Sequence, residues 1–109
     1  MELTFLTAAL REVCEKRAVA VANLGYAAAR ELSDRLADIQ AVDSVDELSQ
    51  LLGQAISDKS ATEKALRLDT GHEILFSSAH PLAGKAPSEM TDWTKTSRMK
   101  ILAIEPTNE

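Results

Sequence analysis

Apolar side chains along this chain recur at two different spacings, and the change of spacing divides the chain into two parts. Between Thr7 and Gly53 they recur every three or four residues, which is the period of an amphipathic helix. From Lys64 onward they alternate with polar residues, which is the period of a strand with one buried face. The pattern therefore predicts a helical first half and a sheet in the second half.

A short strand and two long helices are predicted at the start of the chain. Residues 2–6 alternate as a half-buried strand does, and Thr7 then offers a hydroxyl that can cap a helix. This first helix ends at Gly25. A second helix begins at Tyr26 or Ala27 and carries its apolar stripe to Val42. Because only Gly25 joins the two helices, we expect them to form an antiparallel hairpin.

A third, shorter helix is predicted between Ser44 and Gly53. Ser44 and Glu47 have the spacing of a capping box, in which a hydroxyl and a carboxylate each satisfy a free backbone donor. Val45, Leu48 and Leu52 supply its apolar side. Residues 54–60 are polar and weakly patterned, so they are interpreted as a loop.

The second half predicts three strands. Residues 64–69 and 73–77 alternate, and Asp69-Thr70-Gly71 between them is typical of a hairpin turn. Residues 80–91 contain two prolines and a glycine and are interpreted as a surface loop. Residues 94–104 form a longer strand that is apolar on both faces near its end, which favours a central place in the sheet. The order β-α-α-β-β-β, with the short third helix inserted, predicts an α+β domain with helices on one face of an antiparallel sheet.

Length and composition place these elements in one domain that spans residues 1–109. A chain of 109 residues with 45% apolar residues fits a single hydrophobic core. The first residues lack the basic start and apolar core of a signal peptide, and no apolar run is long enough to span a membrane. Cys14 has no second cysteine to pair with, which indicates a reducing compartment. We therefore expect a cytoplasmic protein, and two histidines with one cysteine predict neither a metal site nor a cofactor.

The charge is unevenly distributed. Twelve basic and seventeen acidic side chains give a formal charge of −5, which disfavours nucleic acid as the main partner of the whole surface. Residues 1–58 hold five basic and ten acidic side chains, whereas residues 59–109 hold seven of each. The excess of acidic residues thus belongs to the helical half, so the net charge does not exclude an RNA-binding site on the sheet.

Several stretches of the chain form a recognisable series when they are taken in order. They are ELTFLT at residues 2–7, LREVCE at 10–15, LG at 24–25, AREL at 29–32, RLADI at 35–39, LRLD at 66–69, ILF at 74–76, DWTK at 92–95 and MKILAI at 99–104. Together they resemble the RelE/ParE superfamily of toxins from bacterial type II toxin-antitoxin modules. The similarity is to the HigB-like branch, also called plasmid maintenance killer or killer suppression protein.

This resemblance implies a toxin fold whose concave sheet face binds ribosome-bound mRNA, and an antitoxin of the helix-turn-helix type as partner. Active members cut mRNA by directing the ribose 2′-hydroxyl at the neighbouring phosphate, which needs an acid, a base and cations for the phosphate. On that model His72 is the acid or base and Arg67 acts beside it. Further RNA-binding cations are expected at Lys64, Lys95, Arg98 and Lys100.

The chain departs from the family in the second strand of the hairpin. The usual text there is Tyr-Arg-Leu-Ile-Phe, whereas this chain reads His72-Glu73-Ile74-Leu75-Phe76, so a carboxylate replaces the arginine. Two functions therefore stay open. One is a HigB/RelE-like mRNA endonuclease. The alternative is a catalytically degenerate member that binds an antitoxin or another protein without ribonuclease activity.

Overall fold

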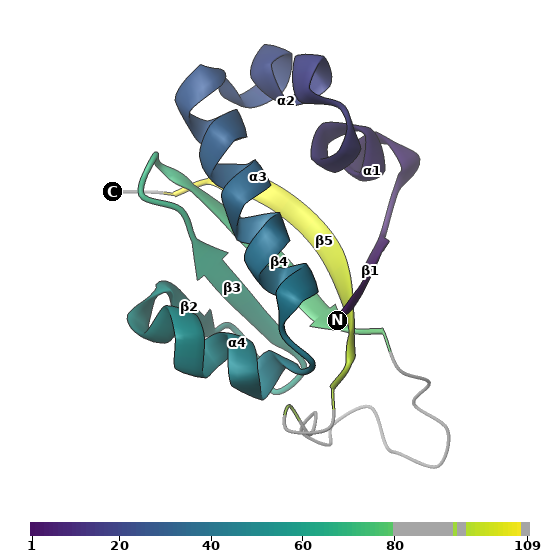
Figure 1. Cartoon of the computed structure of the whole chain (residues 1–109), viewed down its shortest axis with the longest axis vertical. Helices are drawn as coiled ribbons and strands as arrows, with labels where there is room; N and C mark the ends of the chain where they lie inside the picture. Colours follow the sequence, from purple (N-terminus) through teal and green to yellow (C-terminus); the bar gives the residue numbers. More distant parts are fainter. Residues whose placement is uncertain (80–92, 94–95, 108–109) are drawn as a thin grey trace.

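The computed structural model describes residues 1–79, 93 and 96–107. These residues form an α+β domain in which helices lie over one face of a five-stranded mixed sheet (Figure 1). The strand order across the sheet is β1-β5-β4-β3-β2. The elements are β1 (Glu2–Phe5), α1 (Ala8–Glu15), α2 (Arg17–Leu24), α3 (Tyr26–Ala41), α4 (Val45–Leu52), a short 3-10 helix η1 (Gly53–Ala55), β2 (Ile56–Asp58), β3 (Glu63–Arg67), β4 (His72–Ser78) and β5 (Arg98–Pro106).

The sheet is mixed, whereas the sequence predicted an antiparallel one. Strand β1 pairs in parallel with β5, and the other three pairings are antiparallel. The helices connect β1 at one edge of the sheet to β2 at the other edge, and the antiparallel strands β2 to β5 then lead back to β1. Strand β5 thus comes to lie parallel to β1. Strand β5 lies between β1 and β4, which confirms the internal position predicted for the last strand.

The predicted first helix is two helices rather than one, so the prediction of a simple helical hairpin was wrong. Lys16 adopts extended backbone angles between α1 and α2, with φ −114° and ψ 112°. The break lets the two halves contact different elements, because α1 packs near β1 and β5 whereas α2 packs against α3. Ala20 of α2 and Ala28 and Ala29 of α3 are buried, and these small side chains permit close helix packing. Gly25, at φ 88°, ends α2 as predicted.

Helix α4 confirms the third predicted helix. The Ser44 hydroxyl accepts a hydrogen bond from the Glu47 N–H at 3.2 Å. The Glu47 carboxylate in turn accepts from the N–H of Asp43 at 2.8 Å, one residue before the position that a standard capping box uses. Gly53, at φ 57°, ends the helix.

The segment predicted as a loop over residues 54–60 contains η1 and the edge strand β2. Ile56 is opposite Leu66 of β3, and Asp58 is opposite Lys64. A strand of three residues is too short to show alternation, so pairing with β3 rather than local pattern determines it. The loop predicted over residues 80–91 lies outside the described residues.

The core lies between the sheet and helices α3 and α4. Phe76 at the centre of β4 is fully buried, and the Trp93 ring meets it edge-on at a centroid distance of 6.0 Å. This contact packs Trp93 against the core. The buried cluster consists of Leu32, Leu36, Ile39, Val45, Leu48, Leu66, Leu68, Ile74, Phe76, Met99 and Ile101.

Glu31 of α3 fastens the helix layer to the turn between β3 and β4. Its carboxylate accepts hydrogen bonds from the N–H of Asp69 at 2.8 Å and the N–H of Thr70 at 3.0 Å. It also accepts one from the Thr70 hydroxyl at 2.8 Å. Partial burial raises the pKa of Glu31, but these hydrogen bonds and the charge of Arg35 outweigh it and hold the pKa below its usual value.

We expect Glu31→Gln to reduce the free energy of unfolding by about 1 to 2 kcal/mol at neutral pH, because it weakens charge-assisted hydrogen bonds at a partly exposed site. A lowered folded-state pKa means that the stabilisation is complete above the unfolded pKa of about 4.3 and is lost as pH falls through the folded value. Urea denaturation should therefore show that the free energies of unfolding of the wild type and Glu31→Gln differ at neutral pH and that this difference becomes smaller in acid.

A suitable control for Glu31→Gln is Glu12→Gln on α1. Glu12 is more than half exposed and pairs with Lys16 one turn away, so its loss should change stability by less than about 0.5 kcal/mol. A gap between wild type and Glu31→Gln that stays constant with pH would contradict the role assigned to the Glu31 carboxylate.

Candidate functional site

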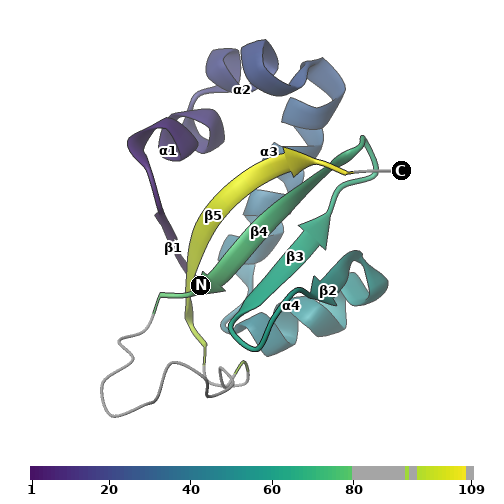
Figure 2. The same ribbon diagram turned by 180° about the vertical axis from the view of Figure 1, so that it is seen from behind.

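The candidate site is the face of the sheet that α3 and α4 leave uncovered, which Figure 2 shows from its own side. We call it the open face. Its members follow from the strand registers, because cross-strand partners point to the same side and neighbours along a strand to opposite sides. Its residues are Glu2 and Thr4 of β1, Glu63, Ala65 and Arg67 of β3, Glu73, Leu75 and Ser77 of β4, and Arg98, Lys100, Ala103 and Glu105 of β5, together with Lys59 after β2, which contacts Glu73 on this face.

Three cross-strand rows organise the centre of the open face. In the first row Glu73 lies between Arg67 and Glu105. The second row is apolar and consists of Ala65, Leu75 and Ala103. The third row runs Glu63, Ser77, Lys100 and Thr4 from β3 to β1. The face thus has an apolar middle with charged rows on both sides.

Glu73 forms an ion pair that crosses the open face. Its carboxylate lies 3.6 Å from the Nζ atom of Lys59, which follows β2. The Glu73 side chain is 19% exposed and that of Lys59 is 43% exposed. Arg67 of β3 is the cross-strand partner of Glu73. The Glu73 carboxylate therefore has one cation on the neighbouring strand, Arg67, and a second one after β2, Lys59.

The charges on the described part of the open face cancel. The four basic side chains are Lys59, Arg67, Arg98 and Lys100, and the four acidic ones are Glu2, Glu63, Glu73 and Glu105. Arg98 is also paired, because its Nε atom lies 2.9 Å from a carboxylate oxygen of Glu2. A phosphate chain needs a net positive surface, and these residues do not supply one.

The two residues predicted to act together in catalysis lie on opposite sides of the sheet. Arg67 belongs to the open face, whereas His72 shares the helix side with Ile74 and Phe76. The His72 carbonyl accepts a hydrogen bond from the N–H of Leu68 at 2.8 Å. Its Nδ1 atom is buried and has no hydrogen-bond partner among the described residues. The structure therefore does not assemble a pair of His72 and Arg67.

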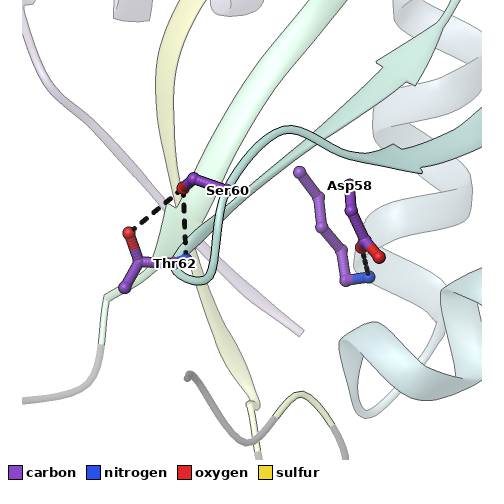
Figure 3. Close-up of polar contacts among 4 residues, drawn as sticks. Asp58, Ser60 and Thr62 are labelled. Atoms are coloured by element: carbon purple, nitrogen blue, oxygen red, sulfur yellow. Dashed lines mark hydrogen bonds and ion pairs between the residues drawn. The ribbon is translucent and has the colours of Figure 1, made fainter. Parts of the chain in front are cut away.

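Lys64, predicted to hold RNA, also lies on the other side from Arg67. Its Nζ atom is 2.5 Å from a carboxylate oxygen of Asp58 (Figure 3) and 5.1 Å from the centre of the Trp93 ring. The Lys64 side chain is 15% exposed. These contacts hold the Lys64 ammonium group within the protein. In the turn between β2 and β3, the Ser60 hydroxyl accepts a hydrogen bond from the N–H of Thr62 at 3.2 Å (Figure 3).

Of the other predicted RNA-binding cations, Arg98 and Lys100 do share the open face with Arg67. Lys95 lies outside the described residues. Lys59 was missed by sequence reasoning, because residues 54–60 were interpreted as a loop and a loop residue has no predictable face. Side chains two residues apart in a strand point to the same face, so recognition of β2 would have placed Lys59 on the same face as Ser57.

Outside the open face, the described residues include one free cysteine, Cys14. Burial, with a smaller effect of the Glu15 charge, raises the pKa of the Cys14 thiol to about 11, so it stays protonated and poorly nucleophilic. Among the described residues, no three His, Cys, Asp or Glu side chains gather closely enough to hold a metal ion. No helix in the described part of the chain has the length and apolar character needed to cross a membrane.

The described part of the open face therefore combines paired charges with an apolar row, and its titratable side chains are carboxylates and strong bases rather than histidine. Such a surface suits contact with another protein, since protein interfaces combine an apolar centre with complementary charges. Comparison of the chain with family models, curated proteins and solved structures found no match.

Proposed function

We propose that this chain is a HigB-like component of a RelE/ParE-type toxin-antitoxin module that acts by binding a protein partner rather than by cutting RNA. The family is proposed on the ordered sequence resemblance, and the α+β order of elements is compatible with it. The first candidate partner is an antitoxin of the helix-turn-helix type.

One observation carries the choice against a ribonuclease. Glu73 stands where the resemblance requires an arginine, and it pairs with Lys59 across the open face. A carboxylate at this place both repels a phosphate and occupies a cation that would otherwise bind one. RNA cleavage would need an acid or base on the same face as the cations. His72, the candidate for that role, lies on the helix side instead.

Ribosome-dependent mRNA cleavage is the second candidate, favoured by the shared position of Arg67, Arg98 and Lys100 on the open face. Guanidinium groups bind phosphate in two-pronged fashion and stay charged at every physiological pH. For cleavage, these three cations would have to overcome the carboxylates beside them.

Expression of the chain in bacteria without any antitoxin distinguishes the two functions. We expect unimpaired growth with soluble, folded protein, and mRNA 5′ ends that match those of cells carrying an empty vector. When a small helix-turn-helix protein encoded next to this gene is co-expressed, it should co-purify with the chain. Growth arrest accompanied by new mRNA ends would overturn the protein-binding function and favour the endonuclease.

A further inference from the structure

Helix α1 buries much less of its surface than α4, although the two helices have the same length and lie at opposite ends of the molecule (Figures 1 and 2). None of the eight residues of α1 is fully buried, and five are exposed. Leu10, Val13 and Cys14 are half-buried and form its contact with the hydrophobic core. In α4, Val45 and Leu48 are completely buried. Burial therefore holds α4 in place more firmly than α1.

Two clefts lie on either side of the place where α1 meets α3. One has a volume of ≈ 300 Å³ and is bounded by α1, α2 and α3, and the other has a volume of ≈ 520 Å³ and is bounded by α1, α3 and β1. Cys14 and Glu15 of α1 and Ser33 of α3 line both clefts. Each cleft contains charged as well as apolar side chains. The two helices thus meet along a narrow line and not over a closely packed interface.

The polar contacts of α1 do not connect it to α3. Arg11 pairs with Glu15 within the helix at 3.6 Å, and Glu12 pairs with Lys16 just after it at 3.7 Å. Among the described residues, no hydrogen bond or ion pair links α1 with α3. The Arg11 guanidinium lies 5.5 Å from the centre of the Phe5 ring of β1, and an exposed cation–π contact of this kind is weak.

Each end of α1 has an extended residue, and a fixed part of the chain lies beyond it. Thr7 has φ −133° and ψ 158°, and Lys16 has φ −114° and ψ 112°. Before Thr7, the N–H of Leu6 bonds to the carbonyl of Ile101 in β5 at 2.9 Å. After Lys16, Ala20 buries α2 against its surroundings. Rotation at the two extended residues can therefore move α1 while β1 and α2 stay in place.

We propose that α1 detaches from α3 as a unit in the native state, by rotation at Thr7 and Lys16, while the sheet and the other helices keep their packing. Detachment joins the two clefts and uncovers Leu32 and Leu36 of α3, each of which lines one of them. Local openings of this kind occur where few buried apolar contacts hold a segment. This inference goes beyond the proposed function and is independent of it, because it follows from the packing of α1.

Amide hydrogen exchange of the wild-type chain tests the proposal, with α4 as the matched control in the same molecule. The comparison uses residues 12–15 and 49–52, the last four of each helix, whose N–H groups have carbonyl partners one turn earlier. After correction for the exchange rates of an unstructured chain, we expect residues 12–15 to exchange at least about 100-fold faster than residues 49–52. Equal protection would overturn the proposal, because α1 would then open only when the whole domain unfolds.

The pattern of exchange along α1 shows whether the helix moves as a unit. In a concerted detachment, residues 12–15 share one protection factor. Protection that decreases steadily toward residue 15 would indicate fraying from the end of the helix. A complete lack of protection would indicate that α1 does not dock at all. Either of these two results would overturn the proposal.

Alkylation of Cys14 gives a second readout, from a side chain of α1. While the helix is docked, burial raises the pKa of the Cys14 thiol to about 11, so the thiol stays protonated and reacts slowly at neutral pH. We expect alkylation to be slower than in the urea-unfolded chain by the same factor that protects the amides of residues 12–15. A factor that instead equals the protection of residues 49–52 would contradict detachment.

Val45→Ala separates detachment of α1 from unfolding of the domain, and Leu51→Ala is its control on the same helix. Val45 is fully buried, whereas Leu51 is 58% exposed. We expect Val45→Ala to speed exchange at residues 49–52 about tenfold and at residues 12–15 less than about twofold, because α4 stays packed when α1 detaches. Leu51→Ala should change neither by more than about twofold. Equal acceleration of both helices by Val45→Ala would overturn the proposal, and the wild-type comparison decides it if that variant does not fold.

Discussion

Glu73→Arg is expected to convert the open face into an RNA-binding surface. The change moves the described charges on this face from zero to +2, because four acidic and four basic side chains become three and five. It also frees Lys59 from its ion pair. We expect affinity for a single-stranded RNA to rise about tenfold at low salt, and each added phosphate contact to steepen the logarithmic salt dependence by about 0.7.

Fluorescence anisotropy with a labelled RNA measures this effect, and Glu12→Arg is the matched control. Glu12 lies on α1, away from the open face, and its replacement changes the net charge by the same amount. If both variants gain affinity equally, bulk charge rather than the position of Glu73 governs RNA binding. If neither gains any, Glu73 does not silence the face.

Phe76→Ala is expected to lower the free energy of unfolding by about 3 to 5 kcal/mol, a large part of the stability of an ordinary domain. Phe76 is fully buried, lies opposite Ile101 of β5 and Lys64 of β3, and meets the Trp93 ring edge-on. Its removal leaves a cavity between the sheet and the helices, and Trp93 loses its aromatic partner. Urea denaturation monitored by far-ultraviolet circular dichroism reports the loss.

Leu75→Ala is the control for Phe76→Ala, because Leu75 is the next residue on β4 and points to the open face instead. Its side chain is half-buried, so about 1 kcal/mol of lost stability is expected. Comparable losses for the two variants would mean that the open face is as deeply packed as the core, which would contradict the layer arrangement in Figures 1 and 2.

Elements with local signals were predictable from sequence, and elements that depend on tertiary contacts were not. The capped helix between Ser44 and Gly53 and the hairpin around Gly71 each carry their own start, stop or turn chemistry. The break at Lys16 has no glycine or proline to mark it, because it results from α1 and α2 packing against different elements. Similarly, β2 exists because β3 pairs with it.

The candidate site shows the same division. Alternation along β3 separates Lys64 from Arg67, and adjacency in β4 separates His72 from Glu73, so both facts were contained in the sequence. The cross-strand register could not be read from the sequence. It pairs Arg67 with Glu73, so these two residues share a face of the sheet and His72 lies on the other face. The ion pair of Lys59 with Glu73 depends on a strand that the local pattern does not reveal.

That the open face, with Glu73 in place of an arginine, does not cut RNA is tested most directly by the map of mRNA 5′ ends in cells expressing the chain without antitoxin. We expect the same ends as in cells with an empty vector, although folded protein is present. New ends within translated codons, absent when Arg67 is replaced by alanine, would contradict it.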